Sequence, residues 1–96
     1  MLVGRHESWF AKKNTRATWR SEARSDPEAV EFLKTLGEQI RSLRNKKGLS
    51  LERAAEGAKL SPQHLVDIEK GRTNPTVTTL VGIARALGVP VHNIFV

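Results

Sequence analysis

Apolar residues recur at intervals of three and four between residues 30 and 43, which is the period of one face of an α-helix. They are Val30, Leu33, Leu36, Ile40 and Leu43. The preceding Ser25-Asp26-Pro27-Glu28 has the order of a helix start, with polar caps, then proline, then an acid. Asn45-Lys46-Lys47-Gly48 has the order of a helix end, because cations favour the C-terminus and glycine permits a left-handed turn. The pattern predicts an amphipathic helix over residues 27–47.

Four shorter helices are predicted after the first, joined by short turns. Their ranges are 51–58, 62–70, 77–87 and 90–95. Ser50, Ser61 and Thr76 each precede one of these helices, and short hydroxyl side chains are typical N-caps. Gly71 and Gly88 end two of them. No segment shows the alternation of a β-strand, so we expect an all-α fold of five helices.

The second and third predicted helices have the spacing of a helix-turn-helix. Within the window from Leu51 to Lys70, a small residue stands fifth and apolar residues stand tenth, fifteenth and eighteenth: Ala55, Leu60, Leu65 and Ile68. The small residue lets the second helix of the pair approach the first closely, and the apolar residues fix their crossing. Helical spacing leaves the opposite face of the 62–70 helix exposed. That face carries Pro62, Gln63, Val66, Asp67 and Lys70.

Several separate motifs along residues 36–95 point to one family. They are Gly48-Leu49-Ser50, Ile68-Glu69-Lys70-Gly71, Asn74-Pro75-Thr76 and Ile83-Ala84-Arg85-Ala86-Leu87-Gly88-Val89. With them, this stretch resembles the Cro/repressor type of helix-turn-helix domain, also called the xenobiotic-response-element family. The resemblance implies a compact five-helix domain over residues 26–96 that regulates transcription by binding specific double-stranded DNA. It also implies a repressor that binds an inverted-repeat operator as a homodimer.

The resemblance assigns roles to individual residues, with the third helix in the major groove of DNA. Base reading is implied for Pro62, Gln63, Val66 and Asp67. Phosphate binding is implied for Ser50, Ser61, His64, Lys70, Arg72, Thr73 and Asn74. Arg44 and Glu69 match positions that form an internal ion pair in relatives. Ile94 and Phe95 are expected to contact a second copy of the chain, although closure of the core is the alternative for this apolar end.

Three residues depart from the pattern of the family. Leu51 stands where relatives often carry a glutamine that contacts DNA, and it cannot replace that contact. Lys59 stands where the turn usually has glycine, so a left-handed turn there costs about 1 kcal/mol unless the turn is rearranged. Asp67 places an acid on the exposed face, where it either accepts from cytosine N4 or weakens non-specific binding.

The charge of the chain is concentrated outside these motifs. The 96 residues carry a net charge of +6, and an excess of basic residues favours contact with polyanions. Residues 1–25 hold six basic and two acidic side chains, whereas residues 26–96 hold ten and eight. We interpret residues 1–25 as a flexible basic arm. The alternatives are a short helix that packs Trp9 and Trp19 on the domain, or a non-native leader.

Other function classes find little support in the sequence. The chain has no cysteine, so disulfide scaffolds and thiolate zinc sites are excluded. Ser61, His64 and Asp67 lie side by side on one exposed helix, without the enclosing pocket of a catalytic triad. The histidines are dispersed, and no apolar run is long enough to span a bilayer. We therefore expect a cytoplasmic protein that is not an enzyme, with no metal, cofactor or membrane partner.

One alternative function stays open. Among the base-reading positions there is no arginine, and the arm carries aromatic residues. Both features suit a protein-interaction module that bridges a regulator or toxin partner to the transcription machinery.

Overall fold

The computed structural model describes residues 26–95. The predicted arm, residues 1–25, lies outside the described residues, as does Val96. Four α-helices and one 3₁₀-helix follow one another, and residues 26–95 contain no strand: α3 (Pro27–Lys46), α4 (Leu51–Gly57), α5 (Pro62–Glu69), α6 (Val77–Leu87) and η1 (Val91–Ile94). The all-α prediction is confirmed for this part of the chain.

The expectation of a fifth α-helix over residues 90–95 is wrong. The segment forms the 3₁₀-helix η1, in which Asn93 N–H donates to Pro90 O at 3.0 Å and Phe95 N–H donates to His92 O at 3.3 Å. Bonds between residues three apart close a turn with fewer fixed residues than an α-helix needs. A four-residue segment after a proline therefore settles into the tighter helix.

The helix ends follow from local side-chain chemistry. Ser50 Oγ accepts from Arg53 N–H at 3.1 Å, Ser61 Oγ accepts from His64 N–H at 3.1 Å, and Thr76 Oγ1 accepts from Thr79 N–H at 3.2 Å. These three hydroxyl groups are the predicted N-caps. The glycines after α3, α5 and α6 adopt the predicted left-handed conformation, with φ of 68°, 72° and 72° for Gly48, Gly71 and Gly88.

Lys59, in the turn between α4 and α5, also has a left-handed backbone, with φ of 60°. The turn therefore keeps the conformation for which the family uses glycine, rather than rearranging around the lysine. A Cβ in this region costs about 1 kcal/mol.

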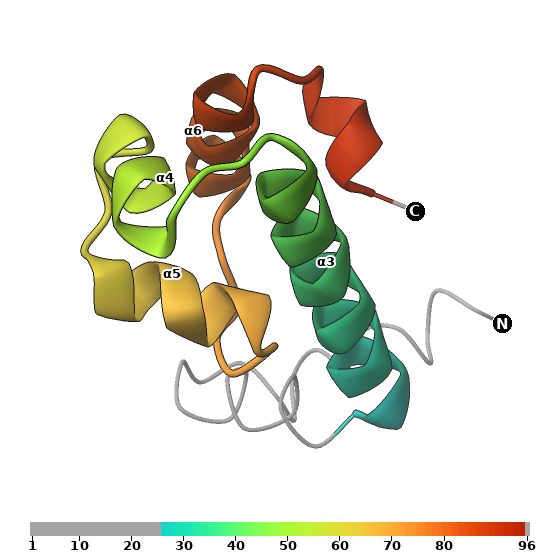
Figure 1. Ribbon diagram of the computed structural model, residues 1–96. Helices are drawn as coiled ribbons and strands as arrows, with labels where there is room; N and C mark the ends of the chain where they lie inside the picture. The colour runs from blue at the N-terminus through green and yellow to red at the C-terminus, as the bar shows by residue number, and fades with distance from the viewer. Residues whose placement is uncertain (1–25, 96) are drawn as a thin grey trace, which may run out of the picture. The chain divides into compact units, whose positions relative to one another are not determined.

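The core draws apolar side chains from all five helices (Figure 1). Its buried members are Leu36, Ile40, Ala54, Ala55, Leu65, Ile68, Leu80, Ile83, Ala84, Leu87 and Ile94. Helix α4 packs on both α5 and α6, and η1 packs on α6. The alanines of α4 are 3% and 0% exposed, which lets α5 approach α4 as the helix-turn-helix spacing requires.

Helix α3 touches the end of α5 at Gly37. A Cβ built on this buried glycine would lie 2.5 Å from the carbonyl oxygen of Ile68 and 2.7 Å from the carbonyl carbon of Glu69. Both are backbone atoms, so no side chain can swing away to make room. The absence of a Cβ at residue 37 therefore sets how closely α3 can approach the last turn of α5.

Candidate nucleic-acid interface

Helix α5 has one buried face and one outward face. Leu65 and Ile68 are 1% and 2% exposed, and they hold the helix on the core. Pro62 and Gln63, two of the residues expected to read bases, are exposed. Val66 and Asp67, the other two, are half-buried along the same outward side. The structure therefore places all four on the side of α5 that the core does not cover.

Three of the predicted site residues form one polar cluster on this face. Gln63 Nε2 donates to Asp67 Oδ1 at 3.1 Å, one helical turn away. Arg72 Nη1, from the loop after α5, lies 3.7 Å from the same carboxylate oxygen. The side chain of Asp67 is 33% exposed and that of Arg72 is 59% exposed. The cluster joins a base-reading position to a phosphate-binding position.

The remaining phosphate-binding candidates surround this face. Ser50, Ser61, His64, Lys70 and Asn74 are exposed, and Thr73 is half-buried. The two serine hydroxyl oxygens accept from backbone N–H groups as helix caps. Each hydroxyl still has its own hydrogen to donate, and helix N-termini favour anions. Two capped helix starts and a basic loop thus border the outward face of α5.

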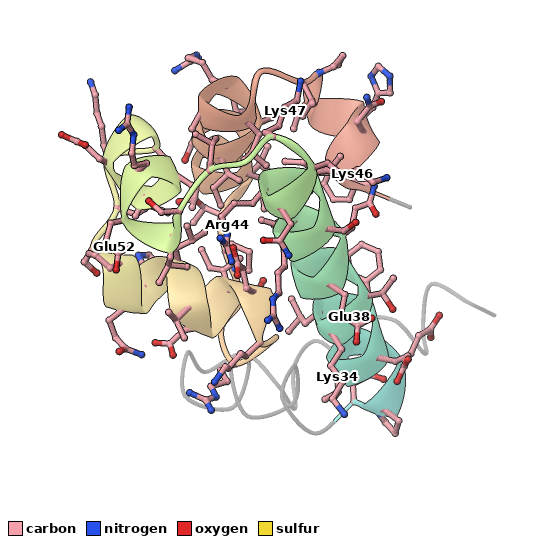
Figure 2. All side chains as sticks on the ribbon, in the orientation of Figure 1. Lys34, Glu38, Arg44, Lys46, Lys47 and Glu52 are labelled. Carbon is pink, nitrogen blue, oxygen red and sulfur yellow. The ribbon has the colours of Figure 1, made fainter. Side chains whose placement is uncertain are left out.

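The orientation of α5 depends on a largely buried ion pair (Figure 2). Arg44 Nε donates to Glu69 Oε2 at 2.7 Å, and Nη2 donates to Glu69 Oε1 at 3.1 Å. The third donor, Nη1, bonds the backbone oxygen of Leu49 at 3.0 Å. The side chains of Arg44 and Glu69 are only 12% and 6% exposed. One guanidinium therefore ties α3, the loop after it and the last turn of α5 together.

The surroundings of Arg44 keep it charged. Its hydrogen bond to Glu69 raises the pKa of the guanidinium, and this effect outweighs burial, which lowers it. The nearby charges of Glu69 and Glu52 raise the pKa of Arg44 further. The ion pair is therefore present from the arginine side at every neutral or acidic pH.

The two residues expected at a dimer contact have different places. Ile94 is 0% exposed and belongs to the core, so its side chain is not available to a second chain; that part of the expectation is wrong. Phe95 is 41% exposed and stacks on Phe32 of α3, with 6.3 Å between ring centroids. Phe32 is itself 50% exposed. We call Phe32 and Phe95 the aromatic patch.

Sequence reasoning missed Phe32. The signal was its place outside the three-and-four series of apolar residues, which leaves a large aromatic side chain off the buried stripe of its helix.

The described residues offer little for other chemistry. Across residues 26–95, no three histidine, aspartate or glutamate side chains gather where they could hold a metal ion. The hydroxyl oxygen of Ser61 bonds the backbone N–H of His64, not its imidazole. None of the helices within this range combines the length and apolar character needed to cross a bilayer.

The arrangement of α4, the tight turn and α5 matches a known sequence pattern. The sequence model of HTH_3, described as helix-turn-helix, matches residues 40–93, more than half of the chain. The chain belongs to this family. The match runs from the middle of α3 to η1 and so includes the ion pair and the outward face of α5.

Individual relatives have names and titles of regulators. The chain is 42% identical over 59 residues to the HTH-type transcriptional regulator DdrOP3 of Deinococcus deserti, covering 62% of this chain and 46% of the relative. It is 42% identical over 60 residues to the immunity repressor protein of Bacillus phage phi105, covering 62% and 42%. The chain thus spans less than half the length of these two relatives.

Among solved structures, the fold resembles the restriction-modification controller protein C.AhdI from Aeromonas hydrophila. The TM-score is 0.65 at 30% sequence identity, and the similarity covers 66% of this chain and 96% of that protein. The shared region is therefore nearly the whole of the controller protein.

Proposed function

We propose that this helix-turn-helix protein is a sequence-specific regulator of transcription that binds double-stranded DNA with α5 in the major groove. The observation that carries the proposal is the outward face of α5, where Gln63 and Asp67 stand beside the basic loop that contains Arg72. A helix that is held rigidly from behind and polar in front suits the major groove, which admits an α-helix and displays donors and acceptors of each base pair.

The proposal extends to the mode of regulation. A repressor requires only occupancy of a promoter, and one relative is an immunity repressor by name. We propose a homodimer, because two copies related by a two-fold axis read an inverted repeat with half-sites one helical turn apart, about 34 Å.

Selection of genomic fragments by the full chain tests this function. We expect enrichment of one inverted repeat over random DNA at physiological salt. Equal binding to all fragments would contradict specific recognition and would favour the protein-interaction module, since phosphate contacts alone give binding without sequence preference.

Gln63→Ala is expected to relax selectivity at one base pair of each half-site by about 1–3 kcal/mol, because a glutamine amide pairs with adenine through two hydrogen bonds. Competition binding with operators altered at single positions measures this loss. Lys70→Ala, at the other end of α5, is the control, since removing a charge that faces phosphate weakens binding to every sequence equally. A uniform loss for Gln63→Ala as well would contradict base reading by Gln63.

The aromatic patch is the proposed contact between two copies of the chain. In an isologous interface the same patch occurs on both subunits, so each substitution removes apolar area twice. The double substitution Phe32→Ser/Phe95→Ser is expected to raise the dimer dissociation constant at least about tenfold, as measured by sedimentation equilibrium.

Val77→Ser provides the control for the aromatic patch, since Val77 is 71% exposed at the start of α6. It is expected to leave association unchanged. The same dissociation constant for the aromatic double variant and the wild type would place the interface elsewhere.

A further inference from the structure

Asp67 stands between the residue proposed to read a base and the residue proposed to bind phosphate. Gln63 Nε2 and Arg72 Nη1 approach the same atom, Oδ1, at 3.1 and 3.7 Å. The three side chains come from two turns of α5 and the loop after it. Their contacts are with one another, on the face that the core leaves uncovered.

We propose that Asp67 is a specificity-determining residue that acts by orienting Gln63 and by engaging Arg72 until DNA is bound. This inference rests on the proposed function, since it concerns how the same face of α5 distinguishes an operator from other DNA.

The orientation of the Gln63 amide follows from the chemistry of a carboxylate. An ionised aspartate only accepts hydrogen bonds, so the amide nitrogen of Gln63, and not its oxygen, must face Asp67. One N–H is used in that bond. The carbonyl oxygen and the second N–H remain, and this donor–acceptor pair is the one that recognises adenine N6 and N7. A neutral amide at residue 67 would accept either orientation of Gln63 and would lose this selection.

The charge of Asp67 also acts on DNA of the wrong sequence. Both contacts use Oδ1, so Oδ2 carries neither of them. A base amine facing Oδ2 satisfies the carboxylate, whereas a base edge with only acceptors leaves a negative charge desolvated and unpaired. Asp67 therefore disfavours non-matching sequences, which is how a repulsive element raises specificity.

Arg72 links this reading to the phosphate backbone. In the free protein its guanidinium lies beside Asp67, and its side chain is 59% exposed. An exposed ion pair of this kind contributes little to folding, so a DNA phosphate can take the guanidinium from Asp67 readily. When Arg72 moves to a phosphate, Oδ1 is left to Gln63 alone. Base reading and phosphate binding are coupled through this one oxygen.

A double-mutant cycle on the full chain tests the coupling. The variants are Asp67→Asn, Gln63→Ala and the two combined, each measured on the selected operator and on a random duplex of equal length. We expect Asp67→Asn to lower the ratio of operator to random affinity about tenfold, partly by tightening binding to random DNA. We expect Gln63→Ala to lower the ratio about tenfold in the wild type but less than twofold in the Asp67→Asn background.

Two further measurements separate this role from a structural one. Freeing Arg72 is expected to steepen the salt dependence of Asp67→Asn binding by up to about 0.9 in the log–log slope per subunit. The melting temperature is expected to match that of Glu56→Gln, a variant with the same charge change. Glu56 is exposed in the last turn of α4, at the opposite end from the capped start of that helix.

The outcomes are distinct. If Gln63→Ala has the same effect in both backgrounds, or if Asp67→Asn leaves the affinity ratio unchanged, the role of Asp67 is overturned while the regulator stands. If the wild-type chain prefers no fragment over random DNA, the proposed function fails, and this inference fails with it.

Discussion

Glu69→Ala is expected to lower the free energy of unfolding by about 3–5 kcal/mol, because the substitution leaves the guanidinium of Arg44 buried without its partner. The two side chains are 12% and 6% exposed and share two hydrogen bonds. Urea denaturation of the wild type and the variant measures the change. The pKa of Arg44 is raised, so the arginine contribution is present through the acidic and neutral range and is lost only in strong alkali.

The double substitution Arg44→Met/Glu69→Met is the control for the ion pair. Replacing a whole buried pair with apolar side chains of similar volume is often close to neutral, since no charge remains stranded. We expect it to recover most of the stability that Glu69→Ala loses. A loss of less than about 1 kcal/mol for Glu69→Ala would show that water reaches Arg44 easily and that the pair does not fix α5.

Gly37→Ala is expected to destabilise the fold by about 3 kcal/mol and to weaken operator binding. The new methyl group would overlap the backbone of Ile68 and Glu69, so α3 and α5 must move apart. Overpacking of this kind usually costs about 1–3 kcal/mol, and the fixed position of the backbone atoms puts this site at the upper end. Thermal unfolding and operator affinity are the two measurements.

Gly82→Ala is the matched control, because Gly82 is also a glycine within a helix. A Cβ there would lie 3.5 Å from the carbonyl oxygen of Ala58, which is an ordinary contact. Alanine is favoured over glycine in a helix by about 0.5–1 kcal/mol, so this variant should be slightly more stable than the wild type. Equal effects of the two alanine substitutions would mean that the crossing of α3 and α5 tolerates a methyl group.

The helices were predictable from sequence because their signals are local. The caps Ser50, Ser61 and Thr76 and the left-handed Gly48 and Gly88 act within one turn of chain, and the structure has each at its predicted position. The family match confirms the helix-turn-helix prediction independently. Periodicity alone also separated Leu65 and Ile68 from the outward face of α5.

The remaining features depend on contacts between residues far apart in the sequence. The close approach at Gly37 involves the backbone of α5, and glycine in a helix pattern indicates only weak helix propensity. The pairing of Phe32 with Phe95 and the burial of Ile94 depend on where η1 folds back. The shared oxygen of Asp67 depends on side-chain rotamers, which no periodicity encodes.

Helix α5 combines two kinds of constraint within eight residues. Its last turn is held by the close approach of Gly37 and by the ion pair with Arg44, whereas its first turn presents Pro62 and Gln63 to solvent. Substitutions of these two exposed residues touch no core side chain, so they change which bases are read without moving the helix. A lineage with this architecture can therefore diverge in its operators quickly while the scaffold stays under strict selection.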